Sequence, residues 1–204
     1  ENINLILKIE KNNYEATRDK AYIHFLKNEF AEATKSIQKI AKLKDDDYFG
    51  YNIKGLISLK NGKLDIAKNY FENAIKINKQ YVDSYNNLGV CLLELEKLNE
   101  AYEIFLDGFN IDTKNIKTLI NLGNVLSLQD KIVEAIKIYN QALNFDPNNQ
   151  EILSNIAICY CREGKLEEAK IYYDRAIEIN PHDYKLQYAY CTLQLKLYKF
   201  YDSW

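Results

Sequence analysis

The sequence has few of the residues from which tight turns are made. Of its 204 residues, seven are glycine and two are proline, and these two types supply most turns that need an unusual backbone. A β-sandwich or barrel requires many such turns, and disordered chains are commonly rich in proline and glycine. The sequence therefore argues against both classes and predicts a helical protein.

The sequence also lacks an excess of charge of either sign. It has 27 Lys and Arg against 29 Asp and Glu, a formal net charge of −2 and a sequence pI of about 5.8. Such a balance does not draw a chain to a phosphate backbone, so we expect no nucleic-acid partner. No apolar run reaches the ~20 residues that a membrane helix requires. We therefore expect no insertion into a membrane.

Cysteine is scarce as well. Four cysteines, Cys91, Cys159, Cys161 and Cys191, are too few for a disulfide scaffold and stand among apolar residues in helical patterns. The first residues also lack the basic segment and small-residue cleavage site of a secretory signal. We therefore expect a reducing, cytoplasmic location, with the cysteines serving as small core residues.

Catalytic motifs are absent from the sequence. It contains no Gly-rich phosphate loop, no His-Glu-x-x-His motif and no nucleophile elbow. Its two histidines are His24, at a helix-packing place, and His182, in a connection after Pro181. No second cysteine pair accompanies Cys159 and Cys161 to complete a zinc site. The sequence predicts no enzyme, no catalytic residue, no metal and no cofactor.

What the sequence does contain is an internal repeat of 34 residues. One column of the repeat is always alanine: Ala33, Ala67, Ala101, Ala135 and Ala169. A second column is always small: Ala21, Gly55, Gly89, Gly123, Ala157 and Cys191. A third column is large and apolar: Ile37, Phe71, Phe105, Tyr139 and Tyr173. A fixed step of this length indicates a stack of similar units that share one continuous core.

Each unit reads as two amphipathic helices. Apolar and small residues recur at steps of three and four, as in Tyr85, Leu88, Gly89 and Leu92. Short polar breaks such as Asn61-Gly62-Lys63 separate the two helices of a unit. Small residues in fixed columns let helix axes approach closely while large residues interlock around them.

The spacing resembles the tetratricopeptide repeat family, with small residues at places 8, 20 and 27 and an aromatic at place 24. The resemblance implies an all-α fold, an α-solenoid that winds as a right-handed superhelix. The full repeats that it implies are residues 14–47, 48–81, 82–115, 116–149 and 150–183. Residues 1–13 resemble the tail of a preceding second helix, and residues 184–204 a partial repeat that ends within its second helix. The chain would then be part of a longer array.

The resemblance also implies a binding surface, because the first helices of such repeats line the inner, concave side. Asparagines gather at the inward places: Asn52, Asn86, Asn87, Asn121, Asn124 and Asn155. Apolar residues on the same side are Tyr22, Phe49, Leu56, Val90 and Ile120. Amides donate and accept, so a row of them can pair with the backbone of an extended peptide. Asparagine at these places can instead support packing between helices, and that alternative stays open.

The sequence thus predicts a scaffold that binds a protein or peptide, as an extended segment or an amphipathic helix, in this groove. A second interpretation comes from Phe200-Tyr201-Asp202-Ser203-Trp204, which resembles the end of the repeat array in bacterial glycosyltransferases. It implies a region that docks substrate for a following catalytic domain. A third interpretation is self-association through the exposed apolar faces of residues 1–13 and 184–204.

Overall fold

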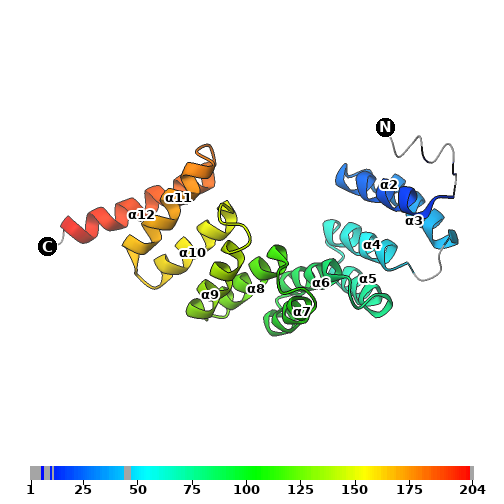
Figure 1. The fold of residues 1–204 in the computed structure, drawn as a ribbon, viewed down its shortest axis with the longest axis horizontal. Helices are drawn as coiled ribbons and strands as arrows, with labels where there is room; N and C mark the ends of the chain where they lie inside the picture. Colours follow the sequence, from blue (N-terminus) through cyan, green and yellow to red (C-terminus); the bar gives the residue numbers. More distant parts are fainter. Residues whose placement is uncertain (1–5, 7–9, 11, 44–46, 203–204) are drawn as a thin grey trace. The chain divides into compact units, whose positions relative to one another are not determined.

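The computed structural model describes residues 6, 10, 12–43 and 47–202, with side chains as far as Leu197. The regular structure of this part of the chain consists of eleven α-helices and no strand, as the repeat predicts. The helices are α2 (Tyr14–Leu26), α3 (Phe30–Leu43), α4 (Tyr48–Lys60), α5 (Leu64–Ile77), α6 (Val82–Glu94), α7 (Leu98–Ile111), α8 (Ile116–Leu128), α9 (Ile132–Leu143), α10 (Gln150–Arg162), α11 (Leu166–Ile179) and α12 (Tyr184–Asp202). They form two compact units, unit 1 (Glu1–Ile111) with α2 to α7 and unit 2 (Asp112–Trp204) with α8 to α12 (Figure 1).

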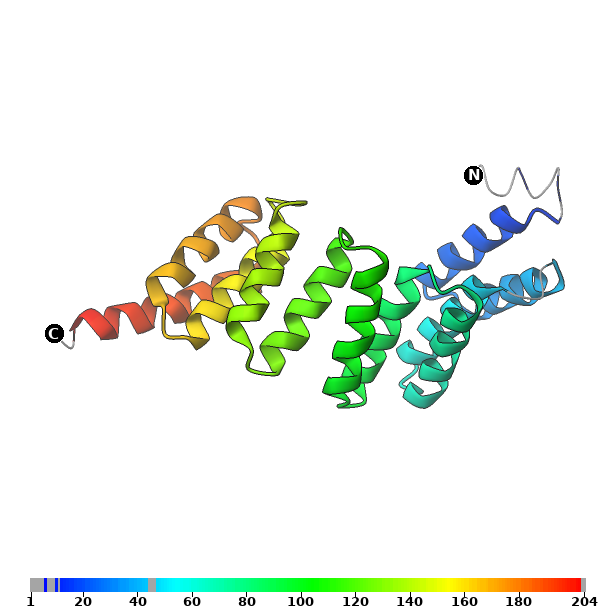
Figure 2. The same cartoon turned by 60° about the horizontal axis from the view of Figure 1, so that its bottom comes forward.

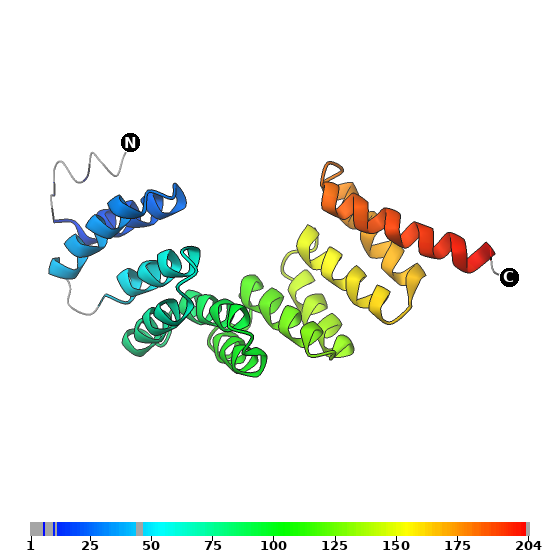
Figure 3. The same ribbon diagram turned by 180° about the vertical axis from the view of Figure 1, so that it is seen from behind.

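Within each unit, consecutive helices pack in pairs. In unit 1 the pairs are α2 with α3, α4 with α5, and α6 with α7, and in unit 2 they are α8 with α9 and α10 with α11 (Figure 2). We call the even-numbered helices first helices and the odd-numbered ones second helices. First helices of neighbouring pairs also contact one another, α2 with α4, α4 with α6, and α8 with α10 (Figure 3). The fold is therefore an α-solenoid of stacked helix pairs within each unit.

The starts of the first helices follow the 34-residue step and share one type of cap. Tyr14, Tyr48, Val82, Ile116, Gln150 and Tyr184 are their first residues. In all but α6, the preceding residue is Asn or Asp, and its side chain accepts a hydrogen bond of 2.8–3.1 Å from a backbone N–H of the first turn. These cap residues are Asn13, Asp47, Asn115, Asn149 and Asp183. Such caps satisfy N–H groups that have no partner within the helix and so fix where it begins.

The turns inside the pairs also follow the step. One residue in each adopts a positive φ: Asn28, Gly62, Glu96, Asp130 and Gly164. The residue after each donates its N–H to a carbonyl near the end of the first helix, as Lys63 N does to Ser58 O at 2.9 Å. This left-handed cap ends a helix sharply and lets the second helix begin two residues later.

The last helix departs from the prediction. We expected the segment 184–204 to turn and enter a second helix, but α12 continues without a break from Tyr184 to Asp202. The place that turns in every pair falls here on Tyr198. An aromatic residue strongly disfavours positive φ, so the helix runs on. Residues 1–13, expected as the tail of another helix, lie largely outside the described residues.

The core lies between the helices of each pair. Gly55, Gly89 and Gly123 on first helices face the rings of Phe71, Phe105 and Tyr139 on second helices. A Cβ at any of the three glycines would lie within 2.4 Å of the ring opposite. The small-residue column therefore exists because the rings occupy the space where a side chain would be. Searched over the described residues, the chain has no helix that is both long and apolar enough to cross a membrane.

Candidate functional site

The predicted site residues all lie on first helices. In unit 1, α2, α4 and α6 hold Tyr22, Phe49, Asn52, Leu56, Asn86, Asn87 and Val90. In unit 2, α8 and α10 hold Ile120, Asn121, Asn124 and Asn155. Contacts between neighbouring first helices bring the members of each set together within their own unit. The two sets differ in how far they reach the surface.

The asparagines of unit 1 bond to one another across the helix interface. Asn87 Nδ2 donates to Asn52 Oδ1 at 2.9 Å, and Ser84 Oγ donates to the same oxygen at 3.3 Å. Asn52 and Asn87 are 3% and 8% exposed, and Asn86 is fully buried. We expected these amides on an open face, but the structure buries all three, and the bond between Asn52 and Asn87 connects α4 to α6. Their bonds follow the packing alternative rather than a ladder open to a ligand.

The asparagines of unit 2 reach the surface. Asn155 Nδ2 donates to Asn124 Oδ1 at 3.0 Å, so the same type of bond connects α10 to α8. The Tyr139 hydroxyl donates to the same oxygen of Asn124. Both asparagines and Asn121 remain half-buried. The Asn124 and Asn155 amides therefore combine packing between repeats with partial exposure at the surface.

The predicted apolar residues are unevenly exposed. Tyr22 is 42% exposed, and Phe49, Leu56 and Val90 are half-buried. Ile120 is only 7% exposed, because it packs inside unit 2 rather than lining its surface. In unit 1, Tyr22 and Phe49 line one hollow beside the first helices and Leu56 lines another.

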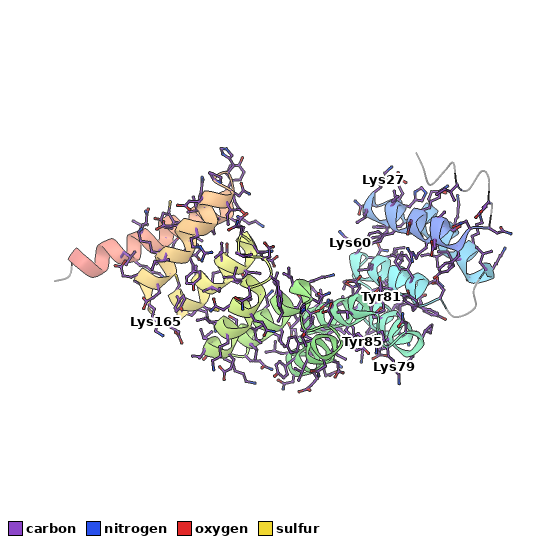
Figure 4. The ribbon with its side chains drawn as sticks, viewed as in Figure 1. Lys27, Lys60, Lys79, Tyr81, Tyr85 and Lys165 are labelled. Atoms are coloured by element: carbon purple, nitrogen blue, oxygen red, sulfur yellow. The ribbon has the colours of Figure 1, made fainter. Side chains whose placement is uncertain are left out.

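The first of these, which we call the aromatic hollow, has a volume of about 440 Å³ and lies between α2, α4 and the start of α6. Its lining residues are Arg18, Asp19, Tyr22, Ile23, Tyr48, Phe49 and Tyr81. Tyr81 comes directly before α6 and lies beside α4, as Figure 4 shows. Burial and the nearby Asp83 carboxylate raise the pKa of Tyr81, which keeps its hydroxyl protonated at neutral pH.

A second hollow in unit 1, of about 380 Å³, lies at the C-terminal ends of the first helices and is mainly apolar. Leu56, Leu59, Lys60 and Glu94 are among its lining residues. Lys60 marks the end of α4, and Lys27 follows the end of α2 on the same side of the unit (Figure 4).

Two hollows in unit 2 adjoin each other between α10 and α12. One, of about 340 Å³, is lined in part by Gln150, Ser154 and Asn155, and the other, of about 460 Å³, in part by Cys161, Leu193 and Lys196. They share Ile158, Tyr173 and Ala189. We call the two together the α10–α12 groove, which is polar at one end and apolar at the other.

Two cysteines and a tyrosine in and near the α10–α12 groove have raised pKa values. Burial raises the pKa of the Cys161 thiol, and Lys196 opposes that shift. Burial likewise raises the pKa of Cys159 and, to about 12, that of Tyr173. A raised thiol pKa means little thiolate at neutral pH, which is the opposite of what a nucleophile needs.

The remaining candidates show no catalytic geometry. The side chain of His24 contacts Glu29 through Nδ1, as a partner within its own turn, and His182 is exposed. Cys91 and Cys159 are buried, Cys161 is half-buried and Cys191 is exposed. Across the ranges that the structure describes, no three His, Cys, Asp or Glu side chains gather closely enough to hold a metal ion.

Sequence reasoning missed several residues that line the hollows, above all Tyr48 and Tyr81 of unit 1 and Lys196 of unit 2. The signal for Tyr81 was present in the sequence. It stands in the column that otherwise holds the Asn and Asp caps. Comparing each place across the repeats, rather than only within the helix pattern, would have found it.

Comparison with known proteins agrees with the arrangement of helices. Family models described as tetratricopeptide repeat match residues 50–81, 70–103 and 126–189, which together make up more than half of the chain. A search of the curated proteins gives no match.

Solved structures share the fold at low sequence identity. YrrB, described as a TPR protein with an unusual peptide-binding site, is similar at 20% identity and a TM-score of 0.67, over 93% of this chain and 97% of YrrB. TTC0263, a thermophilic TPR protein in Thermus thermophilus, is similar at 20% identity and a TM-score of 0.73, over 90% of this chain and all of TTC0263. A chain of the APC/C hetero-tetramer Cut9–Hcn1 gives a TM-score of 0.83 at 17% identity, over 94% of this chain and 38% of that one.

The repeated helix pairs, the ring that faces a small residue in pair after pair, and the three matching family models agree on one assignment: the chain belongs to the tetratricopeptide repeat family.

Proposed function

We propose that the chain is a non-catalytic scaffold that binds a protein partner, as an extended peptide or an amphipathic helix, against its first helices. The observation that carries this proposal is the α10–α12 groove. Its polar end offers the Asn155 amide and the Ser154 hydroxyl, and Ile158 offers an apolar contact where the two hollows meet. Grooves that hold peptides combine a few polar groups for the backbone with pockets for side chains.

Asn155 is suited to the polar role. Its Nδ2 group donates to Asn124, which fixes the side chain and leaves Oδ1 as an acceptor for a peptide N–H. Arg162 fixes the end of α10 in a similar way, since its guanidinium donates to Ser127 Oγ at 2.8 Å and pairs with Asp130 at 2.9 Å. Groups held in place before binding lose less entropy when a partner binds.

The family and its structural neighbours support a scaffold in general terms. YrrB is described as having a peptide-binding site, which makes a peptide a reasonable partner here as well. The five residues behind the glycosyltransferase alternative, 200–204, lie beyond the described side chains. No comparison above favours that alternative.

The proposal is tested by selecting a library of random dodecapeptides, displayed on phage, against the immobilised chain. Peptides that bind are then titrated against three variants: Asn155→Ala, Ile158→Asp and, as a matched control, Ile171→Asp. Ile158 and Ile171 are both exposed isoleucines, at 44% and 60%, but Ile171 lies on the second helix α11. We expect the first two variants to weaken binding about tenfold or more, or by ~1.4 kcal/mol, and the control to leave it unchanged. Equal effects at both isoleucines would contradict a groove on the first helices.

Self-association is a second candidate, favoured by the exposed face of α12. Tyr184, Tyr188 and Leu195 are 83%, 78% and 63% exposed, and Cys191 is exposed although the equivalent small residues of the other first helices are buried. A contiguous apolar face of this kind is a common contact surface. Sedimentation velocity over a hundredfold range of concentration tests it. Dimers that Leu195→Asp dissociates would support it, and a monomer throughout would exclude it.

A further inference from the structure

The aromatic hollow is built from residues that depart from the repeat. The residue before each first helix is Asn or Asp at every start except that of α6, where it is Tyr81. Accordingly, α6 has no side-chain cap. Giving up a cap lowers the stability of a helix. Departures from local rules of this kind gather at functional sites.

Two further departures line the same hollow. The second place of the first helix is charged in every other repeat, as Glu15, Asp83, Lys117, Glu151 and Lys185, but is Phe49 here. The ninth place holds Leu56, Val90, Asn124, Ile158 and Thr192 elsewhere, and an aromatic only at Tyr22. Three independent columns thus change to an aromatic residue around one hollow. Packing alone does not require this, because the other repeats pack without such rings.

The rings meet at steep angles. Tyr22 and Phe49 lie 6.2 Å apart at 68°, and Phe49 and Tyr81 lie 6.4 Å apart at 52°. Tyr48 lies 4.8 Å from Tyr81 at 58°. Rings inclined in this way are not stacked flat on one another, and all four line the hollow. The faces of aromatic rings carry partial negative charge and attract cations.

The charges around the hollow point to the same type of ligand. The guanidinium of Arg18 already lies 5.4 Å from the centre of the Phe49 ring, which shows that the ring accepts a cation. Arg18 Nε and Nη2 both bond to Asp19 Oδ1, at 3.1 and 3.0 Å, which neutralises Arg18 and leaves Asp19 Oδ2 out of the pair. Asp83, beside Tyr81, adds a further carboxylate. Once the Arg18–Asp19 pair is counted as neutral, Asp83 leaves one negative charge beside the hollow.

We propose that the aromatic hollow binds the cationic side chain of a lysine or arginine on the protein partner. The proposal rests on the proposed function, since that partner lies along the first helices. The volume of the aromatic hollow, about 440 Å³, is within the range of small-ligand pockets. The bound cation lies against the rings of Tyr22, Phe49 and Tyr81, and the Asp83 carboxylate beside Tyr81 compensates its charge.

The test uses short blocked tripeptides as probes, titrated into the ¹⁵N-labelled chain and followed by NMR. The probes are acetyl-Gly-Arg-Gly-amide and acetyl-Gly-Lys-Gly-amide, with citrulline and norleucine in the matched neutral peptides. We expect saturable shifts at backbone amides near residues 18–23, 48–50 and 81 for the cationic probes, with Kd of about 1 mM. The neutral peptides should bind about tenfold more weakly or not at all.

Variants then test the aromatic residues. Tyr81→Asn restores the cap that the other repeats carry, so the helix start is retained while the ring is removed. We expect it to weaken the cationic probes about tenfold, and Phe49→Ala to do the same. Tyr70→Asn is the matched control, because Tyr70 lies 6.2 Å from Tyr51 on another part of the unit. It should leave binding unchanged.

Two results would overturn the proposal: equal binding of the charged and neutral peptides, or unchanged binding by Tyr81→Asn with circular dichroism showing intact helices. The proposed function has a separate readout, because it is tested by whether Ile158→Asp in unit 2 weakens binding of the dodecapeptides. If those peptides bind while the tripeptides do not, the scaffold stands and the cation site fails. If the tripeptides bind while no dodecapeptide depends on Ile158, the cation site stands and the proposed peptide groove of unit 2 fails.

Discussion

Replacing Gly89 by alanine tests how tightly the helices of one pair are packed. A Cβ at this position would lie 2.3 Å from Cε1 and 2.5 Å from Cζ of Phe105. Carbon atoms do not approach so closely without repulsion, and Phe105 is fully buried, so its ring has to move. Ala157 and Tyr173 share one core cluster in the last complete pair. A ring can therefore be accommodated opposite an alanine, but only after rearrangement.

The size of the effect follows from two opposing contributions. Forcing an extra carbon into a packed core costs ~1–3 kcal/mol. Alanine in place of glycine within a helix returns up to ~1 kcal/mol. We therefore expect Gly89→Ala to lower the free energy of unfolding by about 1 kcal/mol, although helix propensity alone predicts a gain of similar size.

The measurement is urea unfolding followed by circular dichroism, for Gly89→Ala, Phe105→Leu and the double variant. A smaller residue at 105 makes room for the new Cβ, as Ile37 does in the pair where alanine stands at residue 21. We expect the free energy of unfolding of the double variant to be about 1 kcal/mol higher than the value obtained by adding the two single effects. Strict additivity, or a single variant more stable than the wild type, would refute the packing argument.

Three further predictions concern turns, buried amides and alkaline pH. Glu96→Gly should stabilise the chain by ~1 kcal/mol and Gly62→Ala destabilise it by a similar amount in urea unfolding, because both residues have positive φ, 59° and 69°. Asn52→Ala should cost ~1–3 kcal/mol in the same assay, because two buried donors lose their acceptor, whereas Asn73→Ala, whose bond is exposed, should cost less than ~0.5 kcal/mol. The folded-state pKa of Tyr173, about 12, lies above its ordinary value of 10.0. The protonated side chain therefore contributes fully to the free energy of unfolding below pH 10, and this contribution falls as the pH rises towards 12. This loss, up to ~3 kcal/mol, should be smaller in Tyr173→Phe when unfolding is measured from pH 9 to 12.

The periodic columns made the fold predictable from the sequence. Helix pairs, their order and their facing small and large residues follow from one 34-residue step, because each place repeats its neighbours' environment. The same 34-residue step also carried two signals that the sequence analysis did not follow from repeat to repeat. Asn and Asp caps precede the first helices, and residues of positive φ end them. The second of these accounts for α12, since a tyrosine at position 198 strongly disfavours the positive φ that ends the other first helices.

The site was harder to predict because exposure depends on neighbouring repeats. Asn87 and Asn155 occupy the same place, yet one is buried against Asn52 and the other reaches the α10–α12 groove. The burial of each asparagine depends on its partner in the preceding repeat, and the sequence pattern within one repeat does not show that partner. The aromatic hollow shows the opposite case, in which comparison between repeats does carry the signal.

The most direct test of the proposed binding surface is hydrogen–deuterium exchange of the full chain with a dodecapeptide selected as above. Binding along the first helices predicts slower exchange in α10 and α12, with α9 and the outer part of α11 unchanged. Slower exchange confined to α9 and α11, with α10 and α12 unaffected, would contradict it.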